Sequence, residues 1–231
     1  MEDIATGFHN AIILLLTLDA QLYEIVGLSL AVSLSSVIIS ACLGVPLGAL
    51  IGTHSFPFKN ALLRIIYTFM SLPPVIAGLV VFLLIMRRGP LGSWGLTYTP
   101  TAMVIAQVCL VTPIITGLTY NIVRDKAPTV KALAITLGAG KMESLKLLIF
   151  ELRIGILAAI VTGLGRAISE VGAVMIVGGN IKGKTRVMTT YIAQLKSMGD
   201  YSTAIAVGIV LLIMAFLINT FLYNVQQKIE N

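Results

Sequence analysis

Residues 25–51 read IVGLSLAVSLSSVIISACLGVPLGALI, a run without a single charged side chain. An α-helix needs about 20 apolar residues to cross the hydrocarbon core of a bilayer. This run exceeds that length, and the nearest charge before it is Glu24. We therefore predict a first membrane-spanning helix over residues 22–51 and a fold built from such helices.

Four further stretches are also long enough and apolar enough to cross a bilayer. They cover residues 65–86, 100–123, 154–177 and 202–225. Only helices and closed barrels satisfy all backbone hydrogen bonds inside lipid. Each stretch is far longer than the about 9–11 residues of a barrel strand and does not alternate. The sequence therefore predicts an all-α polytopic membrane protein with five transmembrane helices.

The composition agrees with this fold class. Of the 231 residues, 57% are apolar and only 11% are charged, whereas soluble domains contain about 25% charged residues. Disorder is excluded because it requires low hydrophobicity and high charge. The two cysteines, Cys42 and Cys109, give neither a disulfide framework nor metal-ligand spacing. We expect one transmembrane domain over residues 1–231.

The distribution of basic residues predicts the orientation. The chain carries 16 Lys and Arg against 10 Asp and Glu, and no basic residue precedes Lys59. With the N-terminus outside, nine basic residues fall on the cytoplasmic side and six on the outer side. Cytoplasmic loops are enriched in Lys and Arg, so we predict an external N-terminus and a cytoplasmic C-terminus. No nucleic acid partner is expected, because the sequence has no motif for one.

The N-terminal segment 1–21 is predicted to be interfacial. Its apolar run, residues 11–18, is too short to span a bilayer as a helix. A cleaved signal would begin with positive charge, but this chain begins with Glu2 and Asp3. We therefore expect no cleaved signal.

The longest polar interruption between spans is residues 125–153, on the predicted cytoplasmic side. Pro128 suits the first turn of a helix. Apolar residues then recur at helical spacing, at Val130, Leu133, Ala134 and Leu137. A glycine-rich turn at 138–140 breaks the pattern before it resumes over Lys141 to Glu151. We predict two short amphipathic helices, either packed on the bundle's base or presented to a soluble partner.

Part of this segment resembles a known motif. Residues 132–139 read ALAITLGA and are similar to the cytoplasmic loop motif of ABC importer permeases, Glu-Ala-Ala followed after three residues by Gly. Ala134 and Gly138 match the motif, whereas Ala132 replaces its Glu and Leu133 its first Ala. The resemblance implies that this stretch couples the chain to an ATPase. The implied coupling residues are Ala132, Leu133, Ala134, Thr136, Leu137, Gly138 and Ala139.

The motif also has a physical requirement. A docking helix needs small residues that permit close approach, which Ala134 and Ala139 would supply. It then needs a turn, for which Gly138 is suited because glycine reaches left-handed conformations without steric cost.

A second stretch resembles a narrower group. Residues 165–180 read GRAISEVGAVMIVGGN and look like the molybdate/tungstate permeases, most of all the tungstate type. Residues 71–75, residues 98–107 and Glu151, which replaces a motif proline, also look like that type. The resemblance extends from about residue 22 to residue 223. It implies the type I ABC importer fold and import of tungstate, with molybdate, or less so sulfate or phosphate, as alternative cargo.

The resemblance also implies partners. These are a second copy of this chain, two cytoplasmic ATPase subunits, an extracytoplasmic tungstate-binding protein and the lipid of a prokaryotic plasma membrane. We therefore expect ATP and Mg to bind the partner ATPase. In this chain we expect no cofactor, no metal site, no catalytic residue and no enzyme activity.

Arg166 and Glu170 are charged residues within one predicted span, four positions apart and thus on one helix face. Charges inside a bilayer are costly and are functional candidates. Ser169 and Gly172 lie beside them in sequence. Three roles stay open for this group: a structural ion pair, a gate, or direct contact between Arg166 and the anion.

A basic segment follows the glycine pair 178–179 on the predicted outer side. Asn180, Lys182, Lys184 and Arg186 form a candidate outer mouth. Positive charge there would attract an anion or the acidic surface of a delivering protein. The alternative is an ordinary solvated loop.

Two other classes of protein remain possible from the sequence. A self-sufficient channel or secondary carrier would need its own coupling-ion site. Apart from Glu24 at the very start of the first predicted span, Glu170 is the carboxylate available within the predicted spans. A membrane-embedded enzyme would need a catalytic cluster, for which the sequence offers no candidate.

Overall fold

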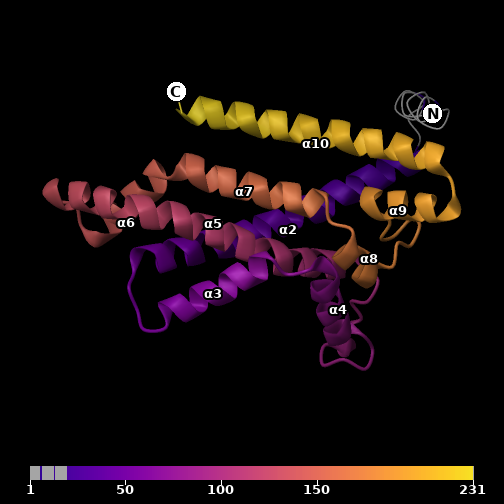
Figure 1. Cartoon of the computed structure of the whole chain (residues 1–231), viewed down its shortest axis with the longest axis horizontal. Coiled ribbons are helices and arrows are strands. Elements are labelled where there is room, and N and C mark those ends of the chain that lie inside the picture. The colour runs from indigo at the N-terminus through magenta and orange to yellow at the C-terminus, as the bar shows by residue number, and fades with distance from the viewer. Residues whose placement is uncertain (1–5, 7–12, 14–19, 231) are drawn as a thin grey trace. The chain divides into compact units, whose positions relative to one another are not determined.

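The computed structural model describes residues 6, 13 and 20–230, and every regular element in this part of the chain is a helix (Figure 1). The predicted all-α fold class is thus confirmed. Apart from Thr6, Ile13 and residues 20–21, segment 1–21 lies outside the described residues, so its interfacial placement stays a prediction. The chain divides into two compact units. Unit 1 contains residues up to Ser36, Pro73–Gln107 and Gly165–Phe221, and unit 2 contains Val37–Leu72, Val108–Leu164 and residues from Leu222 onwards.

Three of the five predicted spans are single long helices. These are α2 (Ala20–Thr53), α5 (Pro100–Thr136) and α10 (Tyr201–Glu230). Among the described residues they alone are long and apolar enough to cross a membrane unaided. Counting each of two bent helix pairs as one further span gives five, so the predicted number is approximate.

The other two predicted spans are interrupted, and the expectation of continuous helices there is wrong. Residues 65–86 divide between α3 (Lys59–Met70) and α4 (Pro74–Ile85). Proline disfavours helical geometry in the residue before it and suits the first turn of a helix, so α4 begins at Pro74. Residues 154–177 divide between α7 (Arg153–Ile168) and α8 (Gly172–Gly178).

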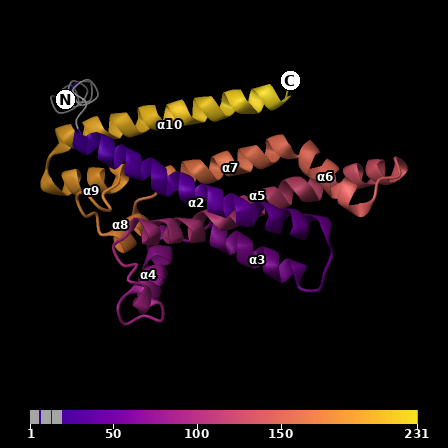
Figure 2. The same cartoon turned by 180° about the vertical axis from the view of Figure 1, so that it is seen from behind.

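The core of unit 1 joins the start of α2 to α9 (Met188–Met198) and α10. Its buried residues are Leu22, Ile25, Met188, Leu195, Ala204, Val207 and Val210. In the same unit α8 lies against α4, as Figures 1 and 2 show. Gly78 permits this contact, because a Cβ there would stand 2.6 Å from the Cα of Ala173. A short 3-10 turn, η1 (Gly92–Trp94), follows α4.

The core of unit 2 joins α2 and α5 to α6 (Lys141–Glu151) and α7. Its buried residues are Ala49, Val123, Ala127, Val130, Leu148, Leu152 and Ile156. Helix α3 runs beside α5 (Figures 1 and 2), where the Tyr67 hydroxyl donates to Asn121 Oδ1 at 2.6 Å.

The packing of this core places Pro128 inside a continuous helix, contrary to the prediction. We expected Pro128 to begin a separate helix, but it lies inside α5, which continues to Thr136. An internal proline costs about 3 kcal/mol in an ordinary helix. Ala127 and Val130, on either side of it, are buried against α6 and α7, and this packing holds the helix through Pro128. The other predicted helix, from Lys141 to Glu151, is confirmed as α6.

Candidate functional site

The turn between α5 and α6 is built by local hydrogen bonds of unit 2. Gly138 has a φ of 75°, in the left-handed region, as the sequence predicted. The Ala139 amide donates to the Ala134 carbonyl at 2.9 Å, which closes the end of α5. At the start of α6 the Gly140 amide donates to Glu143 Oε2 at 2.8 Å. The turn is thus shaped by this chain's own groups.

The exposed face of this turn is made by large apolar side chains. Leu133 and Leu137 are 57% and 74% exposed, and Met142 is exposed as well. Ala134 is fully buried, so the expectation that it offers a small docking surface is not met in this conformation. Ala132 and Thr136 are exposed, and the Thr136 hydroxyl donates to the Ala132 carbonyl at 2.6 Å. We name the exposed group Leu133, Leu137, Gly138 and Met142 the turn surface.

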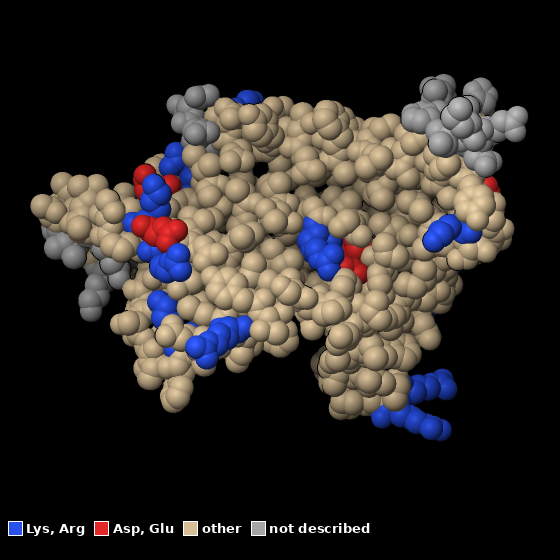
Figure 3. Space-filling view, viewed as in Figure 1, with Lys and Arg blue, Asp and Glu red and all other residues tan. Residues whose placement is uncertain are grey.

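Charged residues lie near this part of unit 2. In Figure 3 most of the face drawn is uncharged, and basic and acidic residues gather near α6. Arg124 pairs with Asp125 at 3.0 Å, with both side chains exposed. Exposed leucines amid charged groups differ from the uniformly apolar surface that faces lipid, and they are typical of a protein contact.

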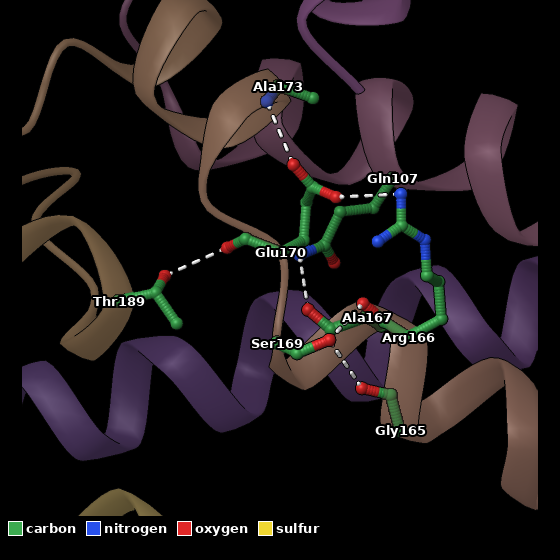
Figure 4. A network of polar contacts seen from close by, with 8 residues as sticks. All are labelled: Gln107, Gly165, Arg166, Ala167, Ser169, Glu170, Ala173 and Thr189. Carbon is green, nitrogen blue, oxygen red and sulfur yellow. Dashed lines mark hydrogen bonds and ion pairs between the residues drawn. The ribbon is translucent and has the colours of Figure 1, made fainter. Parts of the chain in front are cut away.

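The second group of interest lies in unit 1, where α7 ends (Figure 4). Arg166 Nη2 and Glu170 Oε2 are 3.5 Å apart, so the predicted ion pair forms. The two side chains differ sharply in exposure, since Glu170 is 2% exposed and Arg166 is 35% exposed. The buried partner is therefore the carboxylate.

Glu170 has three further contacts that fix the break between α7 and α8. Its Oε1 accepts a hydrogen bond from the Ala173 amide at 3.0 Å. Its carbonyl accepts from the Thr189 hydroxyl at 2.8 Å, and its amide donates to the Ala167 carbonyl at 3.3 Å. The first amides of a helix lack partners within the helix, so the carboxylate satisfies one of them where α8 begins.

The neighbouring predicted residues differ in their surroundings. Ser169 is exposed, and its hydroxyl donates to the Gly165 carbonyl at 2.9 Å. A Cβ at Gly172 would stand 3.1 Å from Val75 Cγ2, so α8 approaches α4 closely here. Arg166 and Ser169 thus face outwards from this chain, and Glu170 and Gly172 face its interior.

Two residues at this site were not among the sequence-based candidates. Gln107 donates from Nε2 to the Ala167 carbonyl at 3.0 Å, and Thr189 reaches Glu170 from α9. A small hollow beside them is also lined by Ser29 and Ser33 of α2. Gln107 was detectable as an amide within an apolar span, whereas the contact of Thr189 depends on tertiary structure.

The candidate outer mouth, also in unit 1, separates into structural and exposed residues. Asn180 has a φ of 52°. Its Nδ2 donates to Gln194 Oε1 at 2.8 Å, and its Oδ1 accepts from the Thr190 hydroxyl at 2.9 Å. Asn180 therefore anchors the loop to α9.

The basic residues of this loop differ in the same way. The Arg186 guanidinium lies 5.1 Å from the Tyr191 ring centroid, so it stacks on the chain itself. Lys182 and Lys184 are exposed, and they are the charges that the loop presents to its surroundings. Within the described residues, no group of three His, Cys, Asp or Glu could hold a metal ion.

These features define a class: a polytopic helical membrane subunit with interrupted spans, an ion pair at one of the breaks, and an apolar turn among charges. A family model described as "Binding-protein-dependent transport system inner membrane component" matches residues 44–231. The chain belongs to this family and is a multi-pass membrane protein. The resemblance to ABC importer permeases inferred from the motifs is confirmed.

Two relatives are similar along nearly the whole chain. The tungstate uptake system permease protein TupB of Peptoclostridium acidaminophilum is 50% identical over 228 residues, which is 99% of this chain and 100% of the relative. The TupB protein of Campylobacter jejuni is 32% identical over 98% of this chain and 95% of its own length.

The fold is also found in a solved structure. A chain of the MetNI methionine ABC transporter, in an inward-facing conformation, superposes with a TM-score of 0.72. The match covers 92% of this chain and 98% of that chain at 20% identity. This likeness confirms the predicted fold of an ABC importer permease.

Proposed function

We propose that this chain is the membrane-spanning subunit of an ATP-driven importer that moves tungstate into the cytoplasm. The observation that carries the proposal is the 50% identity, over 99% of the chain, to a tungstate uptake system permease. The matched region includes both the turn surface and the break between α7 and α8. In this proposal ATP with Mg binds a partner ATPase chain, which supplies the energy for transport.

The exposure of Arg166 supports a pathway beside α7. A charge that faces lipid near the bilayer centre is costly, so intramembrane charges face water-filled cavities or protein. Arg166 lies within a predicted span and is 35% exposed in the single chain. Its guanidinium therefore faces the anion pathway or a second copy of this chain. We propose that two copies enclose the pathway, with Arg166 and Ser169 on its wall and Glu170 behind them.

The turn surface is the proposed contact with the ATPase. Leu133 and Leu137 are 57% and 74% exposed, so much of their apolar surface is not used in the packing of unit 2. Their burial in a groove of an ATPase subunit would stabilise the complex through the hydrophobic effect. Two copies of the chain would bind two ATPase subunits, each through one turn surface.

The basic loop after Asn180 is the proposed outer mouth. Lys182 and Lys184 would raise the local concentration of an anion, or of an acidic binding protein that delivers it. This assignment places the N-terminus outside and the C-terminus in the cytoplasm. Modification of single cysteines with a membrane-impermeant thiol reagent tests it in intact cells. Lys182→Cys should react and Lys146→Cys should not, and the reverse pattern would contradict the orientation.

The cargo is tested in cells that lack this chain. Cells with the gene deleted should accumulate less tungsten from dilute tungstate, and the intact gene should restore accumulation. An excess of molybdate or sulfate should compete poorly. If molybdate abolishes the uptake at equal concentration, the cargo assignment is wrong. If deletion leaves tungsten accumulation unchanged, the proposed function is wrong.

A further inference from the structure

Gln107 is a buried amide that links three helices of unit 1. Its side chain lies in α5, Nε2 donates to the Ala167 carbonyl of α7 at 3.0 Å, and Oε1 accepts from the Ser36 hydroxyl of α2 at 2.7 Å. Gln107 and Ser36 are both buried. Both ends of the amide are therefore used, each by a different helix.

The carbonyl that Gln107 binds belongs to the last turn of α7. The final carbonyls of a helix have no partner within the helix, and within a membrane such groups need one from elsewhere in the protein. Ala167 stands between Arg166 and the exposed Ser169, and its carbonyl also accepts the Glu170 amide at 3.3 Å. Gln107 thus donates to a carbonyl oxygen in the last turn of α7, next to the break between α7 and α8.

A residue of α9 contacts the other side of the break between α7 and α8. The Thr189 hydroxyl donates to the Glu170 carbonyl at 2.8 Å. Residues 167–170 are therefore fixed between an amide of α5 and a hydroxyl of α9 (Figure 4). The hollow lined by Gln107, Ala167 and Glu170 lies beside this turn, and close packing elsewhere in proteins leaves few such spaces.

We infer that Gln107 is a positioning residue for transport: its hydrogen bond to Ala167 holds the end of α7, and so sets where Arg166 and Ser169 stand on the pathway wall. This inference rests on the proposed function. Glutamine suits the role because its amide both donates and accepts. Methionine has a similar size but makes neither hydrogen bond.

The chain offers a matched control for a change at Gln107. The Thr112 hydroxyl donates to Ser40 Oγ at 3.1 Å, which joins the same two helices, α5 and α2, without a contact to α7. Thr112→Val removes a hydrogen bond between these helices but leaves the Ala167 carbonyl bound. A purely structural role for Gln107 predicts that Gln107→Met and Thr112→Val have the same kind of effect.

The experiment uses the complex with its ATPase and binding protein in proteoliposomes. The reporter is Ser169→Cys in a chain with Cys42→Ala and Cys109→Ala. Its reaction rate with a water-soluble maleimide is measured without nucleotide and in the vanadate-trapped state. Tungstate uptake per ATP hydrolysed is measured separately, in chains that keep Ser169.

In the chain that keeps Gln107, we expect the labelling rate of Ser169→Cys to differ between the two nucleotide states. In the Gln107→Met chain, the two rates should be nearly equal. Uptake per ATP should fall by about fivefold or more, as for changes that disturb coupling. Thr112→Val should keep both the difference and the coupling even if it lowers the unfolding temperature. Ser36→Ala removes the hydroxyl that orients the Gln107 amide, so it should reduce the difference in labelling rate between the two states. This variant replaces Gln107→Met in the test if Gln107→Met fails to assemble.

The inference is overturned if Gln107→Met, or Ser36→Ala in its place, retains the state-dependent labelling and the coupling seen with Thr112→Val. Failure of the proposed function gives a different result, since the original chain would then not transport tungstate. The labelling comparison needs no tungstate and is interpreted independently of the cargo.

Discussion

The Glu170 carboxylate is almost wholly buried, whereas the Arg166 guanidinium 3.5 Å away is one third exposed. The pair therefore has an inner and an outer partner. Glu170 also accepts the Ala173 amide where α8 begins, so its position is fixed by the fold. Arg166 is the partner that another molecule reaches first.

The exchange Arg166→Glu with Glu170→Arg should not restore transport, although it preserves the pair of charges. An arginine at 170 cannot accept the Ala173 amide, and a buried group without its partner costs about 1–3 kcal/mol. We expect a lower unfolding temperature and no tungstate uptake. Glu170→Gln is the control, because its amide oxygen still accepts from Ala173 and should preserve more stability. Recovery of uptake by the exchange would show that only the pairing matters.

Gly138→Asp should separate this chain from its ATPase without unfolding it. Gly138 has a φ of 75° and open space around a new Cβ. Left-handed geometry costs most residues about 1–2 kcal/mol, and Asp and Asn are among the few that adopt it. Co-purification of the ATPase subunits should be lost with Gly138→Asp, with the unfolding temperature nearly unchanged. Normal association and uptake in this variant would argue against docking at the turn surface.

Leu137→Ser should lower uptake by weakening ATPase binding. Leu137 is 74% exposed, so its removal from the single chain changes stability by less than about 0.5 kcal/mol. Leu212→Ser is a matched control, because Leu212 of α10 is 70% exposed but lies outside the turn surface. Titration of the ATPase into purified chain measures the affinity. Equal affinities for the two variants would contradict the assignment.

Gly78→Ala should destabilise the contact between α4 and α8. The new Cβ would stand 2.6 Å from the Ala173 Cα, and such overpacking costs about 1–3 kcal/mol. Gly208→Ala in α10 meets nothing within 4 Å and should be neutral or stabilising by up to about 1 kcal/mol. Thermal unfolding in detergent compares them. An equal loss of stability in both variants would indicate that the close contact between Gly78 and Ala173 does not cause the destabilisation.

The sequence was sufficient for those elements that depend on local pattern. Residues 22–51, 100–123 and 202–225 form helices as predicted, and so does the segment from Lys141 to Glu151. Gly138 adopts the left-handed conformation that its place between two helical patterns requires. Length and apolar character decide such features, and both are visible in sequence.

Features that depend on distant partners were not predictable in this way. Residues 154–177 form one apolar run, and the break at 169–171 follows from contacts of Glu170 with Ala173 and Thr189. Pro128 reads as a helix start, but packing around Ala127 keeps it inside α5. Ala134 and Leu137 both belong to the apolar pattern, and only tertiary structure shows which of them is buried.

Transport by the purified complex tests the central claim most directly. This chain would be reconstituted in proteoliposomes with its ATPase subunits and binding protein, and isotope-labelled tungstate would be followed across the membrane. The account predicts directional accumulation of tungstate that requires hydrolysable ATP and the binding protein. Tungstate flux that continues without ATP would contradict it, because the chain would then be a channel or a secondary carrier.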